Sequence, residues 1–275
     1  MESWIAKYLL HAINIEPRDS AAWLNLGMCY DYLNNIEESY KCFIIAAELD
    51  PSSYLVYYNI GNTLYKTKKF DEALINYNKA LKIYPHFASA LSNKGLTLME
   101  IGNYQEALLL IDESLKINPL NCNALRNKAK CHKEQKEYNE AIKAYKKSIS
   151  INAKSTVSLN ELGLCYSELK EYEKAMECFQ RTLEIDSGNL DALRTKILCF
   201  WSMGQPGDAH MFSRMALMII PNDPFILFLK ASIEDNLGKV PEAIESYTRF
   251  VKNASSEMGD QVNIAKGRIA TLSKR

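Results

Sequence analysis

The sequence predicts an all-α protein built from helix–turn–helix units that repeat every 34 residues. Apolar residues follow helical spacing inside each unit, and two columns of small residues keep the same register across residues 20–257 without insertion or deletion. The first column is Ser39, Ala73, Ala107, Ala141, Ala175, Ala209 and Ala243. The second, twelve residues earlier, is Gly27, Gly61, Gly95, Ala129, Gly163, Ile197 and Ala231.

Each unit divides into a first helix, a turn and a second helix. With Ser20 as position 1, positions 4, 8 and 11 hold Trp23, Gly27 and Tyr30 on one face of the first helix. Positions 20, 24 and 27 form the second helix in the same way, and Pro often follows it as a stop. We expect the left-handed conformation that ends a helix at position 15, which Gly and Asn adopt more readily than Lys. Position 15 is Asn34, Lys68, Gly102, Lys136, Lys170, Gly204 and Gly238.

The whole chain, 1–275, is predicted to be a single repeat domain with a helix at each end. Residues 3–19 match only the second half of a unit, so this helix either caps the stack or marks a chain cut from something longer. Residues 261–275 place Val262, Ala265 and Ile269 on one helical face, which predicts a capping helix. The full units are 20–53, 54–87, 88–121, 122–155, 156–189, 190–223 and 224–257.

The repeated motif resembles that of the tetratricopeptide repeat family. It reads W/L-x-x-L-G-x-x-Y, then A-x-x-x-F-x-x-A, then Pro, and it covers nearly the whole chain. The resemblance implies a right-handed superhelical solenoid of about seven repeats, with a concave groove lined by the first helices. Such stacks have contacts between neighbouring repeats only, and their ends need caps.

Composition excludes several classes of partner and compartment. Lys+Arg and Asp+Glu are equal at 33 each, which argues against nucleic acid because phosphate-backbone binders carry a clustered basic excess. No run of about 18 apolar residues is present, so no membrane insertion is expected. The N-terminus does not read as a signal peptide, and the odd count of seven Cys fits a reducing compartment, so we expect a cytoplasmic, soluble protein.

The sequence nominates no catalytic residue, metal site or cofactor. Six of the seven Cys fall at repeat positions 10 and 23, and equivalent positions lie one repeat apart, too far to share a zinc ion. The four His occupy unrelated positions, and neither phosphate-binding glycine motif is present. We therefore predict that the chain is not an enzyme.

Candidate binding residues lie on the first-helix face that the core does not use. Position 6 of four consecutive units is Asn, a mediocre helix former whose amide offers donors and an acceptor to a peptide backbone. This predicted Asn ladder is Asn25, Asn59, Asn93 and Asn127. Asn at this position also has a purely structural interpretation, in which it serves packing or solubility.

Neighbouring residues on this face would give the peptide site its specificity. In the second unit they are Tyr58, Asn62 and Tyr65, and in the fourth Arg126 and Lys130 form a basic patch suited to acidic side chains. At position 7, Lys94, Lys128, Lys196 and Lys230 replace an apolar residue, and we expect their ammonium groups to lie in water at the core edge.

The same face becomes apolar further along the chain. The residues concerned are Leu164, Leu198, Trp201, Phe225 and Phe228. Apolar residues on such a face suggest a hydrophobic groove for a partner helix or for self-association through the C-terminal repeats. In an alternative interpretation, Phe225 and Phe228 are tucked under the C-terminal cap.

Three functions compete for this pattern. The first is a protein-interaction scaffold that binds an extended peptide or partner segment, resembling the Asn-ladder groove of the O-GlcNAc transferase repeats. The second is a structural subunit or repeat region of a larger assembly or enzyme. The third, a co-chaperone that clamps a chaperone tail, requires Lys at position 5, and no unit has it: that column is Leu24, Tyr58, Ser92, Arg126, Asn160, Arg194 and Phe228.

Overall fold

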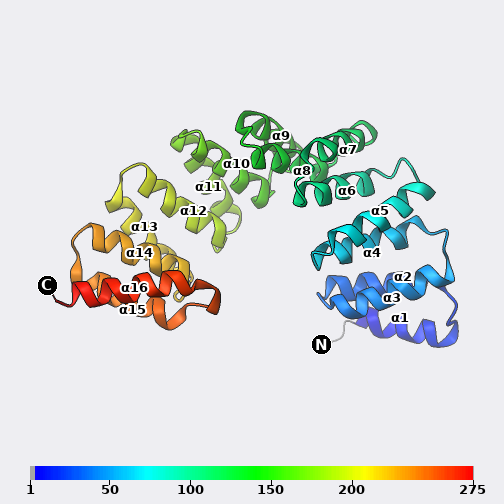
Figure 1. The fold of residues 1–275 in the computed structure, drawn as a ribbon, viewed down its shortest axis with the longest axis horizontal. Coiled ribbons are helices and arrows are strands. Elements are labelled where there is room, and N and C mark those ends of the chain that lie inside the picture. Colours follow the sequence, from blue (N-terminus) through cyan, green and yellow to red (C-terminus); the bar gives the residue numbers. More distant parts are fainter. Residues whose placement is uncertain (1–3, 275) are drawn as a thin grey trace. The chain divides into compact units, whose positions relative to one another are not determined.

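The structure, a computed structural model, describes residues 4–274, and that part of the chain contains helices and no strand. It confirms the predicted all-α class and the repeated helix–turn–helix packing. The chain forms two compact units, Met1–Ile151 and Asn152–Arg275, both traced in Figure 1.

Unit 1 begins with the half repeat and continues through four helix pairs. Each first helix packs against the second helix of its own repeat and also touches the next first helix: α2 touches α4, α4 touches α6 and α6 touches α8. This row of first helices positions the candidate site. The helices are α1 (Trp4–Ile15), α2 (Ser20–Tyr32), α3 (Ile36–Leu49), α4 (Tyr54–Lys66), α5 (Phe70–Ile83), α6 (Ala88–Glu100), α7 (Tyr104–Ile117), α8 (Cys122–Glu134) and α9 (Tyr138–Ile151).

Unit 2 contains three helix pairs and a last helix that packs on α15. Its first helices α10, α12 and α14 again contact one another in order. The elements are α10 (Thr156–Glu168), α11 (Tyr172–Ile185), α12 (Leu190–Ser202), α13 (Pro206–Ile219), α14 (Pro224–Asn236), α15 (Val240–Asn253), the 3-10 helix η1 (Ser256–Met258) and α16 (Gly259–Leu272).

Every turn between paired helices contains one residue with positive φ, at the predicted position 15. The four that are not glycine have φ between 59° and 62°, and among them are Asn34 and Lys68. The three glycines, such as Gly102 at 84°, adopt this left-handed region without strain on a side chain. The prediction for these turns is confirmed.

The two columns of small residues allow close approach within each helix pair. All seven residues at position 20 are fully buried. A Cβ added to Gly27 would lie 2.5 Å from the Phe43 ring, and one added to Gly61 would lie 2.7 Å from the Tyr77 ring. In these two repeats the ring at position 24 therefore occupies the space that a side chain at position 8 would need.

Candidate functional site

The first-helix face of unit 1 contains a pocket of about 240 Å³, built by three consecutive first helices and α5. We call it the polar pocket. Its lining residues are Asp31 of α2, Asn62, Tyr65 and Lys66 of α4, Tyr77 of α5, and Asn93 and Leu96 of α6. The structure thus brings three predicted site residues together: Asn62, Tyr65 and Asn93.

A hydrogen-bond network centred on Asn62 fixes the polar pocket. The Asn93 amide Nδ2 donates to Asn62 Oδ1 at 2.8 Å and to the Tyr58 hydroxyl at 3.2 Å. The Tyr77 hydroxyl donates to the same Asn62 oxygen at 2.9 Å. Burial, with Tyr58 nearby, raises the pKa of Tyr77, so the phenol keeps its proton and remains a donor.

Charged pairs between consecutive first helices flank this network. Lys66 Nζ lies 2.6 Å from Asp31 Oδ1, and Lys130 Nζ lies 2.7 Å from Glu100 Oε1. The Tyr65 hydroxyl also donates to Glu100 Oε1, at 3.1 Å. The hydrogen bond from Lys130 lowers the pKa of Glu100 against the opposing effect of burial, so the carboxylate is ionised at neutral pH.

The four predicted ladder asparagines have different surroundings. Asn25 is exposed and Asn59 is half-buried, with its Nδ2 bound to Leu55 O of its own helix at 2.8 Å. Asn127 is buried and donates to Ser92 Oγ at 3.0 Å. Asn93 and Asn127 therefore connect neighbouring repeats, whereas Asn59 does not.

These cross-repeat bonds follow a rule that the sequence reading missed. Position 6 of one repeat donates to position 5 of the repeat before it, 35 residues away, as in Asn127 to Ser92. Unit 2 keeps the rule with different residues, since the Thr195 hydroxyl lies 3.2 Å from Asn160 Oδ1. The signal that would have revealed it is a polar residue at position 5 of one repeat together with Asn or Thr at position 6 of the next repeat.

The predicted basic patch is partly neutralised. Lys130 is paired with Glu100, as described above. Arg126 is half-buried and forms no ion pair with any residue of the described range 4–274. Its guanidinium therefore has no charged partner among the described residues.

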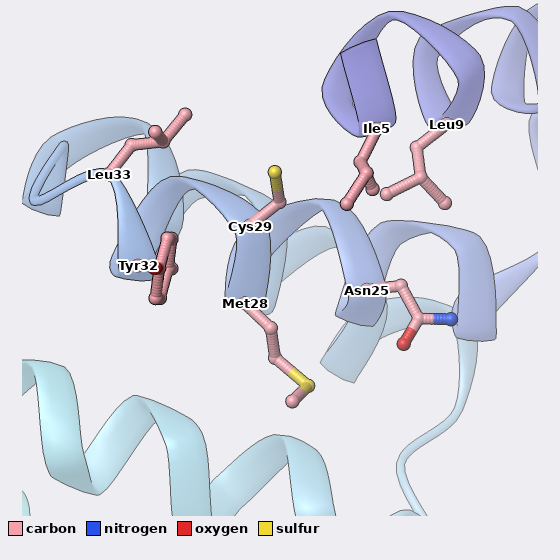
Figure 2. A pocket seen from close by; sticks show the side chains of 7 residues that line it. All are labelled: Ile5, Leu9, Asn25, Met28, Cys29, Tyr32 and Leu33. Atoms are coloured by element: carbon pink, nitrogen blue, oxygen red, sulfur yellow. The ribbon is translucent and has the colours of Figure 1, made fainter. Parts of the chain in front are cut away.

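Asn25 belongs to a second pocket of unit 1, between α1 and α2, with a volume of about 610 Å³. Figure 2 shows Ile5 and Leu9 of α1 directed toward α2, where Met28, Cys29 and Tyr32 lie along the helix. Leu33 completes a lining in which Asn25 is the one amide.

The five residues of the predicted hydrophobic groove do not gather at one place. Leu164 and Leu198 line a pocket of about 410 Å³ in unit 2, which also has polar walls such as Glu168 and Lys170. Trp201 is exposed on α12 but does not line this pocket.

The two phenylalanines of that set make different contacts, one within the last repeat and one with the repeat before it. The Phe228 ring centroid lies 5.0 Å from that of Phe250 and 6.1 Å from that of Tyr247, both on α15. The Arg194 guanidinium lies 5.2 Å from the centroid of the Phe225 ring and bonds Asp223 through two nitrogens. Phe228 thus contributes to the interior, and Phe225 to a cation–π contact between α12 and α14.

Comparison with family models identifies the repeats. Four models described as tetratricopeptide repeat match consecutive segments that together span more than half of the chain. The chain is a tetratricopeptide repeat protein. The matched segments are residues 20–53, 54–87, 88–121 and 120–188.

Solved structures share this tetratricopeptide repeat fold. A chain of the APC/C hetero-tetramer Cut9–Hcn1 matches 84% of this chain with a TM-score of 0.73 and 18% identity, and this chain spans 46% of its length. The match to PilF of Pseudomonas aeruginosa covers 79% of this chain and 100% of the PilF chain, with a TM-score of 0.65 and 21% identity. The match to MamA covers 59% of this chain and 95% of the MamA chain, with a TM-score of 0.53 and 25% identity. No curated protein matches the sequence significantly.

The cysteines of these tetratricopeptide repeats are mostly core residues. Burial raises the pKa of both Cys42 and Cys131 to about 11, so these thiols are protonated at neutral pH. Within residues 4–274, no group of three or more His, Cys, Asp or Glu side chains is arranged to hold a metal ion. No helix in this range is long and apolar enough to cross a membrane.

Proposed function

We propose that the chain is a protein-interaction scaffold that binds an extended peptide along the first-helix face of unit 1. The observation that carries this proposal is the polar pocket, because three consecutive first helices supply its walls. Tetratricopeptide repeat proteins generally mediate protein–protein interactions, which fits a site of this kind.

The polar pocket matches the chemistry of a peptide backbone. An extended chain repeats its outward N–H and C=O groups about every 6.6 Å on one side, and amide side chains pair with both groups. On α4, Leu55, Asn59, Asn62 and Lys66 lie three or four residues apart and so share one helix face. This stripe presents two amides and a cation next to an apolar side chain.

Charged groups of a ligand would bind to the ion pairs that flank the polar pocket. The side chains of Lys66 and Asp31 are both solvent-accessible, at 44% and 31%. An ion pair this exposed contributes only about 0–1 kcal/mol, so a charged ligand group can replace one partner at small cost. Arg126 adds a cation with no described acidic partner, which favours a ligand with an acidic side chain at that point.

Asn59 is the ladder residue whose replacement can test peptide binding without disturbing the packing between repeats. Its amide bonds only its own helix, so Asn59→Ala together with Lys66→Ala should leave the free energy of unfolding within about 0.5 kcal/mol of wild type. Asn93 and Asn127 connect repeats, and their removal would affect stability and binding together.

The test uses peptides selected from a random-sequence display library against the full chain and then synthesised. We expect the double variant to weaken binding of these peptides, measured by calorimetry, by roughly tenfold or more. Asn76→Ala is the matched control, because the Asn76 amide bonds Glu72 O of its own second helix at 2.9 Å. The proposal fails if the library yields no binder, or if the double variant and the control bind equally well.

A further inference from the structure

The second helices of repeats 3 and 4 in unit 1, α7 and α9, line a pocket of about 510 Å³ together with α8. Helix α8 packs against both of them (Figure 1). The pocket shares no lining residue with the polar pocket. We call it the lysine cleft, because four lysines line it: Lys116, Lys128, Lys143 and Lys147.

Two carboxylates of the lysine cleft are each paired with a lysine. Asp112 of α7 accepts a hydrogen bond from Lys128 Nζ at 2.7 Å, and Glu140 of α9 accepts one from Lys143 Nζ at 2.6 Å. The bond from Lys143 lowers the pKa of Glu140, so this carboxylate is ionised at neutral pH. These four groups carry no net charge, so the net positive charge of the cleft belongs to its other two lysines.

Lys116 and Lys147 are the unpaired cations of the cleft. Both are exposed, and neither forms an ion pair with any residue of the described range 4–274. The equivalent residues between the preceding second helices, at positions 29 and 26, carry opposite charges. They are Glu48 with Lys79, and Lys82 with Glu113. Two like charges that line one cleft repel each other, and an anion bound between them removes this cost.

The repeat that forms most of the lysine cleft is also basic as a whole. Repeat 4, residues 122–155, contains nine Lys and Arg but three Asp and Glu, although the complete chain has 33 of each class. A cleft lined by one sign of charge concentrates the field of its surroundings and attracts ligands of the opposite charge. The balanced total charge of the chain therefore conceals a local preference for an acidic ligand.

Apolar side chains of the cleft indicate what kind of anion fits. Leu125 and Ala144 are buried, Leu115 is half-buried, and Leu109 is 72% exposed. A string of phosphates would gain nothing from these side chains and would also meet the two carboxylates of the cleft. A protein segment with acidic side chains beside an apolar one uses both the lysines and the leucines.

We propose that the lysine cleft binds an acidic segment of a partner protein. The carboxylates of the segment pair with Lys116 and Lys147, and an apolar side chain of the segment packs on Leu109 and Leu115. This site goes beyond the peptide site of the first-helix face. Since the two sites share no lining residue, failure of the test below would leave the proposed function standing.

The test measures binding of a synthetic Glu-rich peptide with a central leucine to the full chain, by calorimetry at physiological ionic strength. We expect Lys116→Glu and Lys147→Glu each to weaken binding by roughly tenfold or more. Lys147→Glu gives the cleft the combination of charges that Lys82 and Glu113 have one repeat earlier, so the fold should tolerate it. Urea unfolding checks that both variants remain folded. Replacing the leucine of the peptide by serine should also weaken binding.

Lys252→Glu is the matched control for Lys116→Glu. Lys252 occupies the same position 29 in repeat 7, and both residues lie in the last turn of their helix. The control changes the net charge of the chain and the helix end equally, and it should alter peptide binding by no more than about twofold, since distant exposed charges are screened.

Three results would overturn the proposal. The first is a Glu-rich peptide that does not bind, and the second is equal weakening by Lys116→Glu and Lys252→Glu. The third is tighter binding of a single-stranded DNA oligonucleotide of the same charge than of the peptide, which would show a surface for polyanions in general. Equal binding of the leucine and serine peptides would overturn the apolar contact with Leu109 and Leu115.

Discussion

Repeats 2 and 7 fill the same two positions of the first helix with opposite chemistry. In α4, positions 7 and 11 are Ile60 and Leu64, both buried in an apolar cluster with Tyr77. In α14 the same positions are Lys230 and Glu234. The two helices of the pair have the same lengths in both repeats, 13 and 14 residues, so the repeat determines where a side chain lies but not what kind it must be.

The buried carboxylate of repeat 7 is fully bonded. Glu234 accepts from Lys230 Nζ at 2.5 Å and from Ser246 Oγ at 2.6 Å, and His210 Nε2 lies 2.9 Å away. Burial alone would raise the pKa of Glu234, but these hydrogen bonds outweigh it and lower the pKa below its ordinary value. A buried carboxylate can thus stand where repeat 2 has the buried leucine Leu64, provided that all of its hydrogen-bond partners are present. Losing one of these partners would then destabilise the repeat.

The largest effect is expected from Lys230→Ile, which leaves Glu234 buried without its main partner. Removing one member of a buried pair costs about 3–5 kcal/mol because an uncompensated charge remains. We expect native-state hydrogen exchange to show this loss of protection in α14 and α15.

The double variant Lys230→Ile with Glu234→Leu copies the residues of repeat 2. Replacing both members of a buried ion pair by apolar residues is often neutral or stabilising, so most of the protection should return. If the single variant is as stable as wild type, or if the double variant is no better than the single one, the ion pair is not what holds repeat 7 together.

We expect acid to weaken repeat 7 more than repeat 2. The effect should be smaller than that of Lys230→Ile, because a protonated Glu234 can still form a hydrogen bond with Ser246. The pKa of Glu234 is lower in the folded chain than in the unfolded one, so its stabilisation is complete above the unfolded value and is lost as pH falls through the folded value. We expect protection of α14 and α15 to fall below about pH 4, which hydrogen exchange at a series of pH values would measure. A pH series in which the Lys230→Ile, Glu234→Leu variant loses protection equally would contradict this origin.

The sequence alone was sufficient for the repeat architecture but not for its polar contacts. The column from Ser39 to Ala243 and the turn residues such as Lys68 were predictable, since backbone geometry restricts both to few residue types. The predicted place of the Lys230 ammonium in water was wrong, because Glu234 and Ser246 bind it. Glu234 lies on the same helix as Lys230, four residues on, but Ser246 lies on α15 and His210 on α13, and a single helix pattern does not encode contacts between helices.

The candidate site shows the same limit. The helical wheel placed Asn59, Asn93 and Asn127 on one face, but it could not show that two of them donate to the preceding repeat. That depends on the stagger between neighbouring first helices, which brings position 6 next to position 5. Their part in peptide binding stays a prediction, for which Asn59 is the informative residue.

The smallest effect concerns position 8, which is Gly61 in repeat 2 and Ala231 in repeat 7, each beside a tyrosine at position 24. A Cβ at Gly61 would lie 2.7 Å from the Tyr77 ring, so Gly61→Ala must displace that ring and strain its hydrogen bond to Asn62. The cost of overpacking, about 1–3 kcal/mol, is offset in part by a gain of about 1 kcal/mol in helix propensity. We expect a net loss of up to about 2 kcal/mol in urea unfolding.

The matched control for this substitution is Gly267→Ala on α16, where an added Cβ would meet no atom within 4 Å. Only the helix-propensity gain applies there, so this variant should be more stable by about 0.5–1 kcal/mol. Equal effects at the two glycines would show that the Tyr77 ring moves freely. Repeat 2 would then tolerate alanine as repeat 7 does, and the glycine at position 8 would not be needed for the close approach of α4 and α5.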